Sequence, residues 1–135
     1  MVLALLDLPV EMQFAEGTCS GIDILLVDDD ETFREALAEN FRVDGHVVQE
    51  CGAPPEALAV MRSREFKVLV TDYTMPGGTG LELADRFYEL GGKSVVLVTA
   101  YQNPIVQTRL ATRRYVYLLR KPVDYVEVHC LVHRL

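Results

Sequence analysis

The sequence predicts an α/β fold, with one five-stranded parallel sheet and helices on both of its faces. Short apolar runs that end in polar residues alternate with segments of helical period over residues 22–135. This alternation is typical of parallel sheets that helices cover. The predicted strands are Ile22–Val27, His46–Glu50, Phe66–Val70, Ser94–Val98 and Val116–Leu119.

The first two predicted helices have clear beginnings. Asp30 can cap a helix that starts near Glu31, in which apolar residues recur at three- and four-residue spacing as far as Phe41. Pro54 and Pro55 suit the first turn of a second helix, because a first turn leaves its backbone amides without partners in any case.

The later helices are predicted from turn signals. Glycines and a proline within residues 75–80 form a turn before the third helix, which should bury Tyr88 and stop at the next glycine pair. A fourth helix should start near Pro104. The fifth helix has a weak apolar face that includes Val126 and Cys130.

Length and charge limit the classes of function. A chain of 135 residues is typical of one domain. The net charge of −7 argues against direct contact with nucleic acid, since phosphate binding needs clustered Lys and Arg. We place the domain at residues 21–135 and treat residues 1–20 as an extension. Asp7 and Pro9 interrupt its apolar start, so we expect no signal peptide and no membrane span, and a cytoplasmic protein.

The cysteines and histidines carry no predicted site. The three cysteines are widely spaced and include no C-x-x-C pair, so we expect reduced thiols. The histidines are too few for a metal cluster. We expect His46, His129 and His133 to lie at the surface rather than to bind metal.

Polar residues stand at the ends of four predicted strands. Asp28 and Asp29 follow the first strand, Asp72 the third, Thr99 the fourth and Lys121 the fifth. Ligands bind beyond the carboxyl ends of parallel strands, so these side chains should converge on one acidic pocket. Mg²⁺ prefers oxygen ligands and binds through one or two carboxylates together with a phosphate. The pattern therefore predicts a magnesium-assisted phosphoryl site, in which Lys121 and Thr99 hold phosphoryl oxygens.

Four segments, LLVDDDE, VLVTDYTMPGGTGLEL, VLVTA and LLRKP, resemble the signature segments of the response-regulator receiver domain of two-component signalling. They occur in the order and at the spacings of that family. The resemblance implies the flavodoxin-like receiver fold with strand order 2-1-3-4-5. It also implies that Asp72 accepts a phosphoryl group, and that Asp28, Asp29, Asp72 and the backbone carbonyl of Thr74 bind Mg²⁺.

The same resemblance implies partners and a switch. Thr99 would be the switch hydroxyl and Lys121 the lysine of the site, followed by a cis peptide bond to Pro122. The phosphoryl donor would be a sensor histidine kinase or a phosphotransfer protein. Such a domain is no enzyme in the usual sense, because it catalyses only its own phosphorylation and dephosphorylation. A homodimer through the fourth helix, fifth strand and fifth helix is a further expectation.

Four residues depart from the family pattern or occupy positions that modify its chemistry. Leu118 stands where the family commonly has an aromatic residue on the fifth strand, with Tyr117 one place away. Arg114 and Tyr115 replace the small residues that usually precede that strand. Tyr101 follows the switch threonine by two residues, where it could shield an acyl phosphate from water.

Two other functions stay open at this stage. LLVDDDETF also matches the D-x-D-x-T start of haloacid-dehalogenase-type phosphatases, with Asp28 as nucleophile and Asp30 as acid/base. That interpretation leaves Asp72 and its Met-Pro-Gly turn without a role. The other alternative is a degenerate receiver that works as a binding module. Substitutions at Asp72 and Asp28 separate the two chemical interpretations, since each names a different nucleophile.

Overall fold

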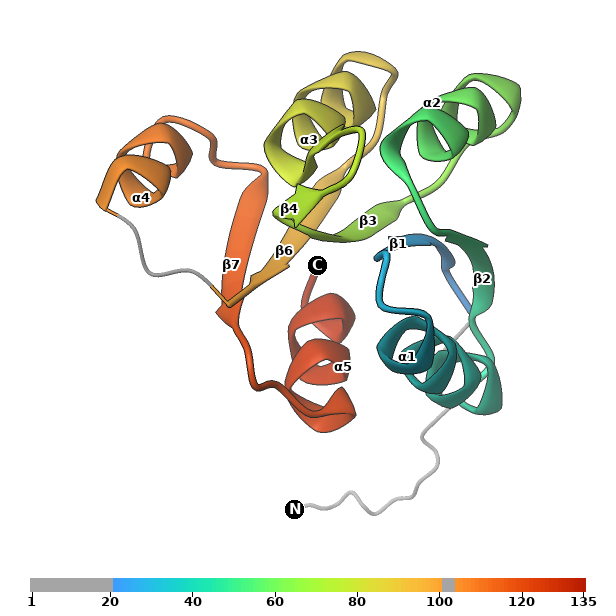
Figure 1. Ribbon diagram of the computed structural model, residues 1–135. Coiled ribbons are helices and arrows are strands. Elements are labelled where there is room, and N and C mark those ends of the chain that lie inside the picture. The colour runs from blue at the N-terminus through green and yellow to red at the C-terminus, as the bar shows by residue number, and fades with distance from the viewer. Residues whose placement is uncertain (1–20, 101–103) are drawn as a thin grey trace.

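Five parallel strands form the main sheet of the protein, seen in the computed structural model in Figure 1. The structure describes residues 21–100 and 104–135, so our predictions for residues 1–20 and for Tyr101 lie outside the described residues. The strands are β1 (Asp23–Val27), β2 (Val47–Cys51), β3 (Val68–Asp72), β6 (Ser94–Thr99) and β7 (Val116–Arg120). Their spatial order is β2-β1-β3-β6-β7, which confirms the predicted order.

Helices cover both faces of this sheet, as predicted. They are α1 (Glu31–Val43), α2 (Pro54–Ser63), α3 (Gly80–Glu89), α4 (Pro104–Leu110) and α5 (Tyr125–His133). Figure 1 shows α1 and α5 on one face, with α2 and α3 on the other. Among the described residues, no helix combines the length and the apolar character that crossing a lipid bilayer requires.

Side chains of the sheet alternate between two apolar cores, because successive residues of a strand point to opposite faces. Ile24 and Leu26 pack with Phe41 in the core beneath α1 and α5. Leu25 and Val27 pack in the core beneath α2 and α3. The apolar residues of the three central strands, β1, β3 and β6, are all buried. Burial on both faces explains why these strands are continuous apolar runs in the sequence.

The helix beginnings have the caps that fix them against the strand ends. Asp30 Oδ1 accepts a hydrogen bond from the Phe33 amide at 3.1 Å, and Pro54 begins α2, both as predicted. At the start of α3, the Thr79 hydroxyl accepts from the Glu82 amide at 3.2 Å, and the Glu82 carboxylate accepts from the Thr79 amide at 3.0 Å. This reciprocal pair satisfies two backbone amides and fixes where α3 starts.

A two-stranded ribbon occupies the stretch that the sequence predicts as a turn. β4 (Thr74–Met75) pairs antiparallel with β5 (Gly78–Thr79). Met75 is buried in the core beneath α2 and α3, which anchors the ribbon. Gly77 and Gly78 have φ values of 99° and 153°, and residues other than glycine rarely adopt such positive values.

The predicted apolar face of α5 is wrong. Val126 is 64% exposed and Cys130 is also exposed, whereas Val128 and Val132 are buried. Val128 and Val132 are four residues apart, so they lie on one face of the helix, and they belong to the core that α1 also covers. Apolar residues occur on several sides of this helix, and packing against α1 selects the buried side.

His46 also differs from its prediction, because it is buried with only 6% of its surface exposed. Its ring meets the Phe41 ring edge to face at a centroid distance of 5.8 Å. His129 and His133 reach the same place from α5, where their ring centroids lie 5.8 and 6.3 Å from that of His46. His133 is exposed as predicted and His129 is partly buried, but the three histidines form one cluster.

Tyr88 does not enter the core as predicted, since it is 53% exposed. Its ring stacks on Tyr115, just before β7, with centroids 4.0 Å apart. Beside this stack, Arg113 Nε and Nη2 donate to the two carboxylate oxygens of Asp85 at 2.8 and 3.0 Å, and the Tyr115 hydroxyl also donates to Asp85. These contacts join α3 to the segment before β7.

We expect an Asp85→Asn variant to lose about 1 kcal/mol of stability at neutral pH, since a partly exposed two-point ion pair contributes on that scale. Hydrogen bonds from Arg113 hold the pKa of Asp85 below its usual 3.8. A lowered folded-state pKa stabilises the protein above the unfolded pKa, and this contribution disappears as the pH falls through the folded pKa. Urea unfolding of both proteins should therefore show a difference at neutral pH that shrinks below pH about 4. An undiminished difference in acid would contradict this origin.

Candidate functional site

Three carboxylates meet at the carboxyl end of the sheet. Asp28 and Asp29 follow β1, Asp72 ends β3, and one carboxylate oxygen of each lies within 4.8 Å of the other two. Asp28 is 2% exposed, Asp72 is partly buried and Asp29 is exposed. The structure thus brings together the carboxylates that the sequence placed at strand ends.

Lys121 lies between two of these carboxylates. Its Nζ is 3.2 Å from Asp28 Oδ2 and 3.6 Å from Asp72 Oδ2. The same ammonium lies 4.8 Å from the centre of the Phe33 ring, which attracts a cation through its negative face. The peptide bond from Lys121 to Pro122 is cis, as the family resemblance implies.

Asp28 is held in place by its own backbone contacts. Its Oδ1 accepts from the Asp30 amide at 2.9 Å, and its carbonyl oxygen accepts from Arg34 Nη1 at 2.8 Å. Arg34 is in turn paired with Glu50 of β2 at 3.1 Å. Oδ2 of Asp28 faces Lys121, so both carboxylate oxygens have a fixed orientation.

Asp72 is oriented by the backbone that follows it. Its Oδ1 accepts a hydrogen bond from the Tyr73 amide at 2.8 Å. Burial raises the pKa of this carboxyl group, the cation of Lys121 lowers it, and the negative charge of Asp28 raises it again, with a net upward shift. The upward shift of the pKa means that burial and the neighbouring carboxylates raise it more than the Lys121 cation lowers it.

Thr99 and Thr74 occupy the margins of this site. Thr99 ends β6 and is buried, and its carbonyl oxygen accepts from the Lys121 amide at 2.8 Å. In the register of the sheet Asp72 lies beside Val98, so Thr99 is one residue further along. Thr74 is exposed and lies in β4, two residues after Asp72.

The start of α3 presses against the end of β3. The Gly80 amide donates to the Tyr73 carbonyl oxygen at 2.6 Å, and a Cβ atom at position 80 would come within 2.0 Å of the Asp72 carbonyl oxygen. Sequence reasoning missed Gly80, as it missed Phe33 and Arg34. For Gly80, the glycine-rich turn is the only signal in the sequence. For Phe33, the helical spacing indicates a core position and nothing about the site.

The phosphatase alternative fits this geometry poorly. Asp30 is exposed and its side chain caps α1 through the Phe33 amide, while Asp28 is buried against Lys121. In that arrangement Asp28 is not an accessible nucleophile.

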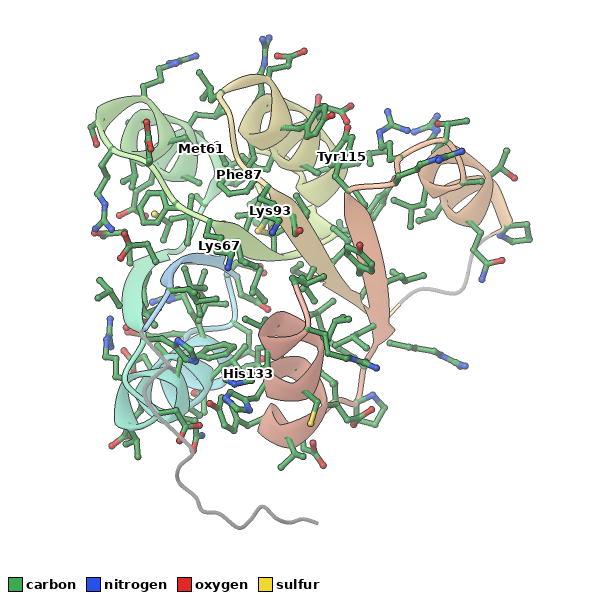
Figure 2. The ribbon with its side chains drawn as sticks, turned by 180° about the vertical axis from the view of Figure 1, so that it is seen from behind. Met61, Lys67, Phe87, Lys93, Tyr115 and His133 are labelled. Carbon is green, nitrogen blue, oxygen red and sulfur yellow. The ribbon has the colours of Figure 1, made fainter. Side chains whose placement is uncertain are left out.

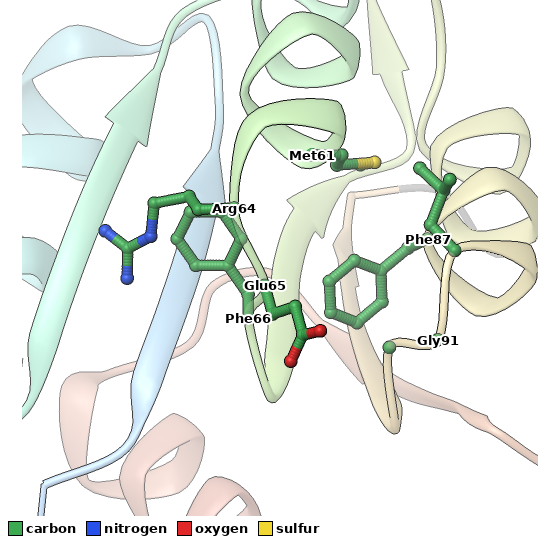
Figure 3. A pocket seen from close by; sticks show the side chains of 8 residues that line it. Met61, Arg64, Glu65, Phe66, Phe87 and Gly91 are labelled. Atoms are coloured by element: carbon green, nitrogen blue, oxygen red, sulfur yellow. The ribbon is translucent and has the colours of Figure 1, made fainter.

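A small pocket lies at the opposite end of the sheet from the carboxylates, before β3 and β6 (Figure 3). Its volume of about 40 Å³ admits only a few water molecules. The Arg64 guanidinium lies over the Phe66 ring at 4.3 Å from its centre. The pocket is therefore a packing gap rather than a substrate site. Its lining residues are Met61, Arg64, Glu65, Phe66, Phe87, Leu90, Gly91 and Gly92.

Fold and site together define a doubly wound α/β protein with an acidic site at the carboxyl ends of its strands. The sequence model of the response regulator receiver domain family matches residues 24–133. The chain belongs to this family, and it is a receiver domain of two-component signalling. Its family works with histidine kinases or phosphotransfer proteins.

Known proteins support this placement. The chain is 32% identical over 120 residues to the uncharacterized 14.6 kDa protein in the sodA1 3′ region of Leptolyngbya boryana, covering 87% of this chain and 92% of that one. It is 28% identical over 116 residues to the DNA-binding transcriptional regulator NtrC of Azospirillum brasilense, covering 85% of this chain but only 24% of the regulator. The chain thus spans about a quarter of the length of this second relative.

Solved structures show the same fold. The CheY-like response regulator receiver domain protein of Methanospirillum hungatei JF-1 superposes with a TM-score of 0.79. The two sequences are 21% identical, and the match covers 85% of this chain and 93% of the other. This likeness concerns the fold alone.

Proposed function

We propose that Asp72 is the phosphoacceptor of this receiver domain and that it takes its phosphoryl group from a sensor histidine kinase or a phosphotransfer protein. The observation that carries this proposal is the cluster of Asp28, Asp29 and Asp72 with the Lys121 ammonium 3.2 Å from one carboxylate and 3.6 Å from another. Asp72 is the last residue of the central strand β3, and the start of α3 packs against its backbone.

The donor set suits Mg²⁺. Three carboxylates with one cation leave an excess of negative charge, and all available ligands are oxygens, which Mg²⁺ prefers. We propose that Asp28, Asp29, Asp72 and the backbone carbonyl of Thr74 hold the ion. When bound, Mg²⁺ would neutralise the charge of the transferred oxygens.

Asp72 attacks through a carboxylate oxygen. The Tyr73 amide occupies Oδ1, which orients the group, and Oδ2 faces Lys121. An oxygen–phosphorus bond forms as the phosphorus–nitrogen bond of the donor phosphohistidine breaks, and the imidazole leaves with the electron pair and takes up a proton from solvent. The product is an acyl phosphate that water later hydrolyses.

The switch follows from new hydrogen bonds to the phosphoryl oxygens. We propose that the Thr99 hydroxyl and the Lys121 ammonium donate to them and shift the population of the neighbouring loop. Leu118, at the position where an aromatic residue is common, is 38% exposed, as is Tyr117. The surface that we propose for a homodimer is formed by α4, β7 and α5, on which Val126 is 64% exposed.

Domain limits and location belong to the same proposal. Residues 21–135 form the receiver domain and residues 1–20 an extension, in a cytoplasmic protein. The net charge of −7 supports the absence of direct contact with nucleic acid.

The test is peptide mapping after incubation with acetyl phosphate and Mg²⁺. An adduct on the peptide that contains Asp72 supports the proposal. Turnover of phosphate esters that needs Asp28 but not Asp72 would instead indicate the phosphatase, and the absence of both activities would favour the binding module.

Lys121→Met should slow phosphorylation by acetyl phosphate by roughly 10²–10³-fold, as the loss of a charge-stabilising donor does elsewhere. The reason is that its ammonium is the nearby cation of the carboxylate cluster. Lys93→Met is the matched control, because Lys93 is exposed and precedes β6 at the other end of the sheet (Figure 2). Equal rates for the two variants would remove Lys121 from the mechanism.

A further inference from the structure

Three histidines meet at the end of the sheet opposite to the acidic site. His46 immediately precedes β2, and His129 and His133 lie on α5. One ring nitrogen of each lies within 4.8 Å of those of the other two. Figure 2 shows His133 on α5, on the side that faces α1. The receiver chemistry uses none of these residues.

The spacing on α5 is one that metal sites use. His129 and His133 are four residues apart, so both rings lie on one face of the helix and one turn from each other. Histidine pairs at this spacing on helices bind zinc. His46 adds a third ring from the residue before β2. Ligands from two separate elements fix the position of a metal ion better than ligands from one helix alone.

His46 has a ring nitrogen that the described protein leaves unsatisfied. Its Nδ1 accepts a hydrogen bond from the Ile22 amide at 3.2 Å, but its buried Nε2 has no hydrogen-bond partner among the described residues. A buried polar atom without a partner costs about 1–3 kcal/mol, so it calls for a physical explanation.

A carboxylate supports the cluster from outside. Asp44 Oδ2 lies 3.6 Å from His129 Nε2 and accepts a hydrogen bond from the Tyr125 hydroxyl. Ligating histidines commonly pair their second nitrogen with a carboxylate, which orients the ring and increases its basicity. Asp44 is placed beside His129 for such a pair, at a separation slightly longer than a hydrogen bond.

We propose that His46, His129 and His133 form a second metal site, for a divalent transition metal ion of the zinc type, with water completing the coordination. Imidazole nitrogens suit Zn²⁺ rather than Mg²⁺, so the two sites select different ions. Zinc–nitrogen bonds of about 2.1 Å place tetrahedral ligands about 3.4 Å apart, so the rings draw closer on binding. The proton on His46 Nε2 moves to Nδ1 through solvent, and the hydrogen bond from Ile22 is exchanged for the metal bond.

Titration of the full chain with ZnCl₂ in excess Mg²⁺ tests this site by calorimetry. We expect one Zn²⁺ per chain and affinity at least roughly tenfold weaker in both His129→Gln and His133→Gln, which lie on the partly exposed helix face. Cys130→Ser, which removes the exposed thiol beside His129, and Asp72→Asn should bind Zn²⁺ as the parent does.

Amide spectra supply a second readout, since Zn²⁺ should shift the Ile22 resonance in the parent but not in His133→Gln. Failure to bind Zn²⁺, unchanged affinity in the histidine variants, or loss of binding in Cys130→Ser or Asp72→Asn would overturn the proposal. None of these outcomes depends on phosphorylation.

Discussion

An Asp72→Asn variant is expected to take up no phosphoryl group from acetyl phosphate and Mg²⁺, whereas the parent carries one per chain. The amide that replaces the carboxylate has no nucleophilic oxygen anion, and no other carboxylate of the cluster has the same setting. Asp28 is 2% exposed and bound to Lys121, and Asp29 is exposed and lies in the turn before α1 rather than in a strand. Intact-mass measurement at several times gives the result directly.

Asp30→Asn is the matched control for that variant. Asn caps a helix about as well as Asp, so the bond to the Phe33 amide and the stability of α1 should persist. A receiver should therefore keep its phosphorylation in this variant, whereas a phosphatase that used Asp30 as acid/base would lose its activity. An adduct that survives in Asp72→Asn would contradict the assignment of the phosphoacceptor.

Gly80→Ala is expected to cost roughly 3 kcal/mol of folding stability, the scale of severe overpacking. The new Cβ atom would lie 2.0 Å from the Asp72 carbonyl oxygen and 2.8 Å from Leu97 Cδ1. A backbone oxygen cannot move aside as a flexible side chain can, so α3 must shift away from the end of β3. Urea unfolding measures the loss.

The matched comparison is Gly92→Ala. A Cβ atom there would lie 2.3 Å from the Phe87 ring, at the end of the sheet far from the carboxylates. This ring can tilt, so we expect a smaller loss of stability. Under conditions in which both variants are folded, only Gly80→Ala should slow phosphorylation, because only that change displaces the backbone of Asp72. Equal slowing in both variants would show that stability alone is responsible.

Strand ends made most of the acidic site predictable. Asp28 and Asp72 follow apolar runs that are buried on both faces, and Lys121 follows the apolar run of the edge strand β7. The topology of a parallel sheet then brings the ends of those runs together. Neither step needs a side-chain conformation. Helix caps such as Asp30 were predictable for a similar reason, since the cap is a local interaction within a few residues.

Contacts between distant elements were not predictable in this way. The burial of His46 depends on α5 packing across the start of β2, and the choice of Val128 over Val126 depends on where α1 lies. Short helices with apolar residues on several sides do not specify their own buried face. The close approach of Gly80 to Asp72 likewise arises only when α3 docks against β3.

The two groups that we propose as ligands of the phosphoryl oxygens end strands of unequal local stability. β6 is buried throughout, whereas every side chain of the edge strand β7 is at least partly exposed. Local opening should therefore cost much less free energy for β7 than for β6. A phosphoryl group bound by both Thr99 and Lys121 would connect the end of β7 to the end of β6 and so reduce local opening of β7. A partner would then detect phosphorylation as a change in how often the edge of the sheet opens.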